Sequence, residues 1–214
     1  MNNTSFDINK ITETHNLAEN RGYSIYASEW AAQQNAGIFE IISRFIETTK
    51  PSRILEIGTA LGGLPCFLNH ICDSINLPCK ILSYDIEHYA WYPNIRDLGV
   101  DVRVENIFLD NYTRVKEEVS QFIQQEGRTL VLCDGGSKIH EFKVLSGFLK
   151  PDDIIMAHDY APSADYFNDH MYLKIWNWHE IQDSDVEECC KEYDLQPFNQ
   201  EEFIQVAWMC RIKK

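Results

Sequence analysis

The sequence lacks several features that would place it in common classes of protein. No uninterrupted apolar stretch in its 214 residues approaches the ~20 residues that a membrane-spanning helix requires. No hydrophobic leader follows Met1. Basic residues are scarce, since 19 Lys and Arg stand against 33 Asp and Glu, for a net charge of −14. We therefore expect no nucleic-acid partner and no membrane partner, because anionic partners need clustered cations.

The cysteines show no metal-binding or disulfide pattern. Their number, seven, is odd, and no two of them have CxxC spacing. Together with the missing leader, this predicts reduced thiols in a cytoplasmic protein.

Internal repeats, low-complexity tracts and Gly/Ser linkers are also lacking. Hydrophobic residues make up 44% of the chain, which is typical of a folded protein. We expect residues 1–27 to form a polar arm or cap and residues 28–214 to form one domain. Within it, an amphipathic pattern predicts a helix that begins near Ser28 and ends before Pro51.

Short apolar runs alternate with helical stretches over most of this domain. The runs cover residues 53–57, 80–84, 100–104, 129–133 and 153–157, and the helical stretches between them cover residues 63–75, 89–98, 112–125 and 137–149. Continuous apolar strands separated by helices predict an α/β fold with a doubly wound, mostly parallel sheet. Residues 195–198 and 203–211 are expected to add an antiparallel terminal hairpin. Residues 161–198 read as an irregular aromatic and acidic insertion near the active site.

Polar groups follow every apolar run, at the sheet edge where open α/β proteins bind ligands. In the first loop, glycines allow a sharp turn close to a ligand. Glu56, two residues before Gly58, disfavours a phosphate but suits a cationic ligand. Asp85, 27 residues after Gly58, is placed to accept both hydroxyls of a ribose. A nucleoside with a cationic centre and no phosphate is S-adenosylmethionine.

The stretch Leu55-Glu56-Ile57-Gly58-Thr59, with Gly62-Gly63, resembles the first motif of the class I S-adenosylmethionine-dependent methyltransferases. Residues 130–160, with Asp134-Gly135 and His158-Asp159-Tyr160, resemble a small-molecule subgroup whose members carry Asp-Gly-Asp-His and a later His-Asp-Tyr. In this chain Gly136 and Ser137 replace the second Asp and the His. The resemblance covers about residues 36–160 and the closing strand, and it implies a seven-stranded, Rossmann-like methyltransferase fold.

The resemblance also implies residue roles and an activity. The cofactor-binding residues would be Glu56, Gly58, Thr59, Gly62, Asp85, Asn106 and Asp134, with Asp85 on the ribose and Asn106 near the adenine. The activity would be methyl transfer to an oxygen or nitrogen of a small molecule or sugar. Two alternatives stay open: a binding subunit that keeps the fold without catalysis, and a nicotinamide-dependent oxidoreductase. A homo-oligomer is also left open.

Asp134, His158 and Asp159 form a second candidate cluster, for catalysis or metal binding. Two carboxylates and an imidazole at neighbouring strand ends can hold Mg²⁺ or Mn²⁺, which would lower the pKa of an acceptor hydroxyl. Alternatively, His158 and Asp159 act as a general base without a metal, or the residues serve only structure. Lys138 is expected to be a solvated lysine in the first turn of a helix. The aromatic residues 160–178 are expected to pack in the core rather than to form a lid.

Overall fold

The fold is built on a seven-stranded, mostly parallel sheet, in a computed structural model that describes residues 32–89 and 92–214. The strand order is β3-β2-β1-β6-β7-β9-β8. β9 pairs antiparallel with both neighbours, and every other pairing in this sheet is parallel. The predicted α/β class, the doubly wound mostly parallel sheet and the antiparallel terminal hairpin are confirmed.

The strand bounds follow the apolar runs closely. The strands of the sheet are β1 (Arg53–Ile57), β2 (Lys80–Asp85), β3 (Asp101–Val104), β6 (Thr129–Cys133), β7 (Ile154–Ala157), β8 (Leu195–Pro197) and β9 (Met209–Lys213). Two of the five predicted runs, 53–57 and 129–133, coincide with strands to the residue.

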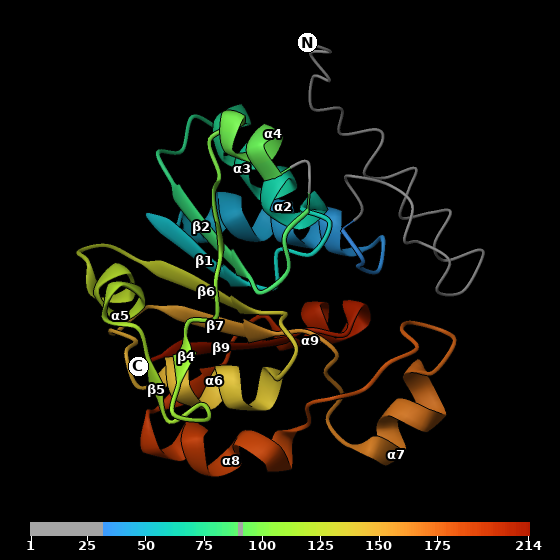
Figure 1. Cartoon of the computed structure of the whole chain (residues 1–214). Helices are drawn as coiled ribbons and strands as arrows, with labels where there is room; N and C mark the ends of the chain where they lie inside the picture. The colour runs from blue at the N-terminus through green and yellow to red at the C-terminus, as the bar shows by residue number, and fades with distance from the viewer. Residues whose placement is uncertain (1–31, 90–91) are drawn as a thin grey trace.

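Helices cover both faces of the sheet (Figure 1). One face carries α2 (Ile38–Thr49), α3 (Gly63–Ser74), α4 (Tyr92–Asp97) and α9 (Gln200–Phe203). The other face carries α5 (Glu117–Gln124), α6 (Lys138–Ser146) and α8 (Asp183–Glu192). A short α7 (Ala164–Tyr166) continues into a π-helical turn, Phe167–Met171.

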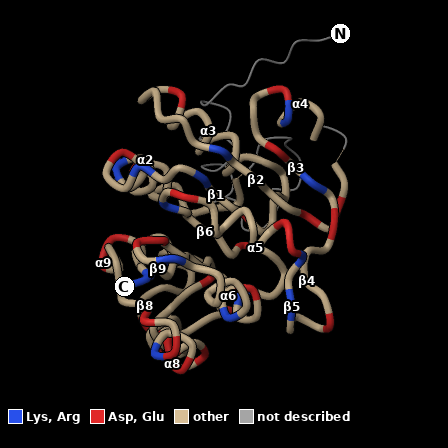
Figure 2. The backbone as a smooth tube through the Cα atoms, turned by 90° about the vertical axis from the view of Figure 1, so that its left-hand side faces the viewer, with Lys and Arg blue, Asp and Glu red and all other residues tan. Residues whose placement is uncertain are grey.

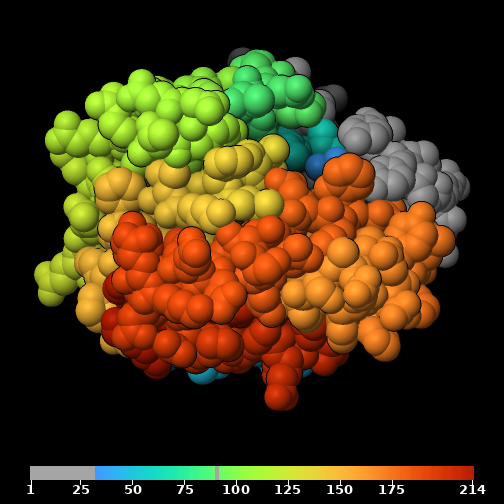
Figure 3. All heavy atoms as spheres, turned by 90° about the horizontal axis from the view of Figure 1, so that it is seen from below, coloured from blue at the N-terminus to red at the C-terminus, as the bar shows by residue number. Residues whose placement is uncertain are grey.

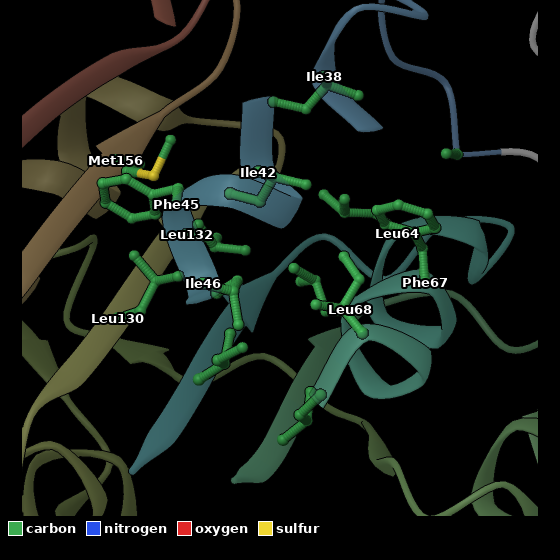
Figure 4. Packing of buried hydrophobic residues seen from close by; sticks show 14 of the residues in the cluster. Ile38, Ile42, Phe45, Ile46, Leu64, Phe67, Leu68, Leu130, Leu132 and Met156 are labelled. Carbon is green, nitrogen blue, oxygen red and sulfur yellow. The ribbon is translucent and has the colours of Figure 1, made fainter. Parts of the chain in front are cut away.

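Alternate strand residues enter two different cores. In β6, Leu130 and Leu132 face the core under α2, whereas Val131 packs toward α6. Figure 4 shows Phe45 and Ile46 of α2 beside Leu130 and Leu132. Because successive side chains of a strand point to opposite faces, a strand covered on both sides must be apolar throughout. This explains why the runs carry no period-two pattern.

The predicted helix from Ser28 begins later than expected. Ser28 and the proposed boundary between residues 27 and 28 lie outside the described residues. Over the described part the helix begins at Ile38, because Gln33 has a positive φ of 51°. The side chain of Gln34 instead bonds to Trp208 and Asp134, so this segment is drawn into the molecule and cannot continue the helix.

Two further segments differ in secondary structure from the sequence prediction. Part of the helix predicted over 112–125 is a small antiparallel hairpin, β4 (Phe108–Leu109) with β5 (Arg114–Val115). The strand predicted over 203–211 begins only at Met209, after α9 and the 3₁₀ turn Ile204–Val206. Phe203 and Val206 pack in the core with residues of α2.

The charged residues of the outer helices are interspersed. Figure 2 shows acidic and basic positions along α2 and mainly acidic positions along α8, rather than a basic stripe. Within residues 32–89 and 92–214, no helix has the length and apolar character needed to cross a membrane.

One buried carboxylate shapes the loop after β6. Glu141 of α6 is only 1% exposed, and its two oxygens accept hydrogen bonds from the backbone N–H of Gly135 (3.1 Å) and of Ser137 (3.0 Å). A Cβ at Gly135 would lie 2.4 Å from the Glu141 carboxylate, so a side chain there would displace this carboxylate. Burial raises the pKa of Glu141 to about 7.

This raised pKa predicts a pH-dependent stability. Ionising the buried Glu141 destabilises the folded state. The contribution of this group to the free energy of unfolding therefore falls as pH rises from its ordinary pKa of 4.5 to about 7. Between about pH 5 and about pH 8 the loss is about 2 kcal/mol. We expect Glu141→Gln to lack this part of the pH dependence when the free energy of unfolding is measured with urea. The control Glu47→Gln, at an exposed position, should keep it. Equal pH dependence of wild type and Glu141→Gln would contradict the assignment.

Candidate active site

A pocket of about 460 Å³ lies at the carboxyl ends of β1, β2, β3 and β6. Its lining includes four of the residues predicted to bind a cofactor: Gly58, Asp85, Asn106 and Asp134. These residues are far apart in the sequence and meet because the parallel strands end at one edge of the sheet. Glu56, Thr59 and Gly62, also predicted to bind the cofactor, stand outside this lining.

The loop after β1 is held by the strands on both sides of it. The N–H of Gly58 donates to the carbonyl of Tyr84 (2.8 Å), and the N–H of Asp134 donates to the carbonyl of Ile57 (2.9 Å). Gly58 has a φ of 94°, and a Cβ there would lie 2.2 Å from the Asp134 carbonyl oxygen. Gly58 is therefore required by the close approach of two strand ends, whatever the pocket binds.

Asp85 lies at the end of β2 with its carboxylate already oriented. One oxygen accepts from the N–H of Ala60 (2.6 Å) and the other from the N–H of Glu87 (2.8 Å). Each oxygen keeps one further lone pair for an external donor. A fixed carboxylate at the pocket wall suits two neighbouring hydroxyls, and the predicted role of Asp85 on a ribose stays a prediction.

Glu56 is buried in β1, at 1% exposure, beneath the loop. One of its oxygens accepts from the hydroxyl of Ser83, which in turn lies 2.6 Å from the hydroxyl of Thr59. Its other oxygen, Oε1, has no hydrogen-bond partner. Burial raises the pKa of Glu56 well above its usual range. Because the raised pKa favours the neutral carboxyl, Glu56 supports the loop through its hydrogen bond with Ser83 rather than through charge.

The far end of the pocket is largely apolar. Asn106 follows β3, and its side-chain oxygen accepts from the N–H of Phe108 (2.9 Å), which leaves the amide NH₂ for a ligand. Phe108 and Tyr112 stack with ring centroids 4.6 Å apart, and Ile86 is 74% exposed at the lining. The sequence analysis did not name these three residues, because their place follows from the unpredicted β4–β5 hairpin and the loop after β2.

Asp134 connects the pocket to a buried polar cluster. Its Oδ1 accepts from Nδ1 of His158 (2.9 Å), and its Oδ2 accepts from the side-chain amide of Gln34 (2.7 Å). The carbonyl oxygen of Gln34 accepts from the indole N–H of Trp208 (2.8 Å). Both carboxylate oxygens of Asp134 are thus positioned by groups far away in the sequence.

His158 lies behind Asp134 and does not line the pocket. Its ring packs between Trp208 and Trp176, with centroid distances of 4.9 and 4.8 Å. Burial lowers the pKa of His158, but Asp134 and Asp159 outweigh it and raise that pKa above its usual value. The geometry makes His158 a partner that orients Asp134, at a distance from any ligand in the pocket.

Lys138 is buried, at 6% exposure, so the expectation of a solvated lysine is wrong. Its ammonium donates to the Gly135 carbonyl (2.8 Å), to Asp159 Oδ2 (2.9 Å) and to Glu180 Oε2 (3.2 Å). Burial lowers the pKa of Lys138, but Asp134, Asp159 and Glu180 together raise it well above its usual value. The lysine folds inward because these carboxylates surround the first turn of α6.

Two contacts of this cluster come from the first part of the predicted insertion (residues 161–198), which Figure 3 shows (orange) beside α6 (yellow). The indole N–H of Trp176 donates to Asp159 Oδ1 (2.6 Å), and Glu180 also accepts from the backbone N–H of Lys138 (2.8 Å). The sequence analysis placed Glu180 in an acidic insertion without assigning it a role, so it missed this contact. Among the described residues, no aromatic side chain of 160–178 lines the pocket.

The predicted metal-binding residues do lie together. Ligand atoms of Asp134, His158 and Asp159 are all within 4.8 Å of one another. However, the Lys138 ammonium already lies 2.9 Å from the Asp159 carboxylate and 3.9 Å from Asp134. A divalent ion bound to both carboxylates would meet this ammonium at close range. With Lys138 in this position the donor set does not fit a metal ion.

Comparison with solved structures shows a shared fold at low sequence identity. A caffeoyl-CoA O-methyltransferase from Staphylococcus aureus, so described provisionally, is 13% identical, with a TM-score of 0.55 over 98% of this chain and 93% of that one. The cmcI-D160 structure with Mg-SAM is 10% identical, with a TM-score of 0.53 over 82% and 71% of the two chains. The citrinin polyketide synthase CMeT domain is 13% identical, with a TM-score of 0.51 over 81% of this chain, which spans about half (52%) of that protein.

A comparison with curated protein sequences finds no match. The family profile of Rhamnosyl O-methyltransferase/CmcI matches residues 32–177, which is more than half of the chain. That range contains the pocket loops after β1, β2, β3 and β6 as well as His158 and Asp159. The chain therefore belongs to the Rhamnosyl O-methyltransferase/CmcI family.

Proposed function

We propose that this protein is an S-adenosylmethionine-dependent O-methyltransferase. The observation that carries the proposal is the pocket at the sheet edge, where Gly58, Asp85, Asn106 and Asp134 line one cavity of about 460 Å³. Family membership supports it, and the same membership disfavours the nicotinamide-dependent alternative. Oxygen is preferred over nitrogen as the acceptor atom because the family is described by O-methylation.

The residues present fit an adenosyl sulfonium. Asp85 presents both carboxylate oxygens to the pocket for the ribose hydroxyls. Asn106 offers its amide at the apolar end, where Ile86 and Phe108 can cover the two faces of an adenine. The carboxylate of Asp134, which lies in the lining, places negative charge at the other end of the pocket. When bound, the cofactor supplies an electrophilic methyl group on a positively charged sulfur.

Asp134 is the residue that we assign to the acceptor. It belongs to both the pocket lining and the polar cluster, and its carboxylate is held by His158 and Gln34. A bound cofactor would supply the methyl group, and Asp134 would accept the proton that the acceptor hydroxyl loses as its oxygen takes up that methyl group. Asp159, bonded to Lys138 and Trp176, supports His158 and stays remote from the acceptor.

The acceptor class that we propose is a small molecule or sugar with a free hydroxyl. The family description names a rhamnosyl substrate, and the net charge of −14 disfavours nucleic acid. We also keep the proposal of a cytoplasmic protein with one methyltransferase domain over residues 28–214.

The first prediction concerns Asp85. Loss of hydrogen bonds from two hydroxyls to a carboxylate costs about 3 kcal/mol, which corresponds to at least about 100-fold weaker binding. We expect Asp85→Ala to weaken S-adenosylhomocysteine binding by that factor in titration calorimetry. Asp97→Ala, at an exposed position of α4, is the control and should bind like wild type. Wild-type protein that binds NAD and not S-adenosylhomocysteine would refute the proposed function.

The second prediction concerns Asp134 and tests whether catalysis is retained. Wild-type protein incubated with S-adenosylmethionine and a panel of hydroxylated sugars and phenols should yield a methylated product by mass spectrometry. Asp134→Asn keeps the shape of the side chain but removes the base, so we expect turnover to fall about 100-fold or more. S-adenosylhomocysteine binding should change far less than turnover. Cofactor binding without any product across the panel would favour the alternative of a binding subunit.

A further inference from the structure

The ammonium of Lys138 lies in a ready-made cation site. Its three N–H donors have three acceptors: the carbonyl oxygen of Gly135 and carboxylate oxygens of Asp159 and Glu180. Asp134 Oδ1 stands slightly farther away, at 3.9 Å. The acceptors come from three parts of the chain: the loop after β6, the end of β7 and the segment before α8. Such a shell of oxygen atoms around one positive charge is what a hard metal ion would require.

The surroundings of Lys138 favour the inward orientation of its side chain. The side chains of Lys138 and Asp159 are 8% and 9% exposed, so moving the ammonium into solvent would leave a buried carboxylate without its partner. Trp176 closes the other side of Asp159 through its indole N–H. The carboxylates and the lysine therefore stabilise one another in this arrangement.

We propose that Lys138 is the resident cation of this site and that it excludes Mg²⁺ and Mn²⁺ from Asp134, His158 and Asp159. This inference rests on the proposed function for its meaning, since it makes the methyl transfer independent of a divalent metal. Lys138 does not line the pocket, so it is a positioning residue. It binds the loop that carries Asp134 to the end of β7 and to Glu180, and it supplies the positive charge behind Asp134.

The experiment is a Mn²⁺ titration followed by electron paramagnetic resonance, on full-length wild type and on Lys138→Met. Methionine is close to lysine in length but carries no charge. Wild type should leave the free Mn²⁺ signal unchanged at millimolar ion. Lys138→Met should bind one Mn²⁺ per chain, because removing the ammonium exposes the carboxylates. Lys143→Met, at an exposed position of the same helix, is the control and should behave as wild type.

Two outcomes would overturn the inference. One is stoichiometric Mn²⁺ binding by wild type, a result that needs no variant to fold. The other is a folded Lys138→Met, checked by thermal melting, that binds no more Mn²⁺ than wild type. S-adenosylhomocysteine calorimetry on the same samples separates this inference from the proposed function. Failure of wild type to bind that ligand would end the proposed function, while the Mn²⁺ titration would still decide what Lys138 does.

Discussion

The contact between the backbones of Gly58 and Asp134 is the constraint on which the rest of the site depends. A side chain at position 58 would overlap the Asp134 carbonyl. Because this contact brings the ends of β1 and β6 together, the loops beyond them lie side by side and share one pocket. Glu141 then holds the second loop from below through the N–H groups of Gly135 and Ser137.

Behind the pocket, the structure places several ionisable groups in a nearly closed space. Burying charges is costly, and it is tolerated only where partners and hydrogen bonds compensate. Here Lys138 compensates for Asp159 and Glu180, and His158 for Asp134. His158 and Lys138 also lower the pKa of Asp159, although burial raises it. The charges are therefore interdependent, and no single member can be removed without leaving another unpaired.

The sequence was sufficient for the sheet and for the place of the pocket. Buried parallel strands are largely apolar on both faces, so the runs at 53–57 and 129–133 could be located to the residue, and the polar groups after them marked the edge where the pocket lies. The inward turn of Lys138 could not be predicted in this way. It depends on Glu180, which lies 42 positions away in the chain and approaches only after the segment beyond β7 has packed. The place of Gln34 in the polar cluster could not be predicted for a similar reason, since its two partners are 100 and 174 positions away in the chain.

The two anchors of Asp134 have a consequence for how the site responds to a change of charge. Each of its oxygens is bonded to a side chain that is itself buried and fixed. Such a carboxylate does not have to turn or exchange water molecules when a charged group comes near it. The cost of that reorientation is met once, during folding.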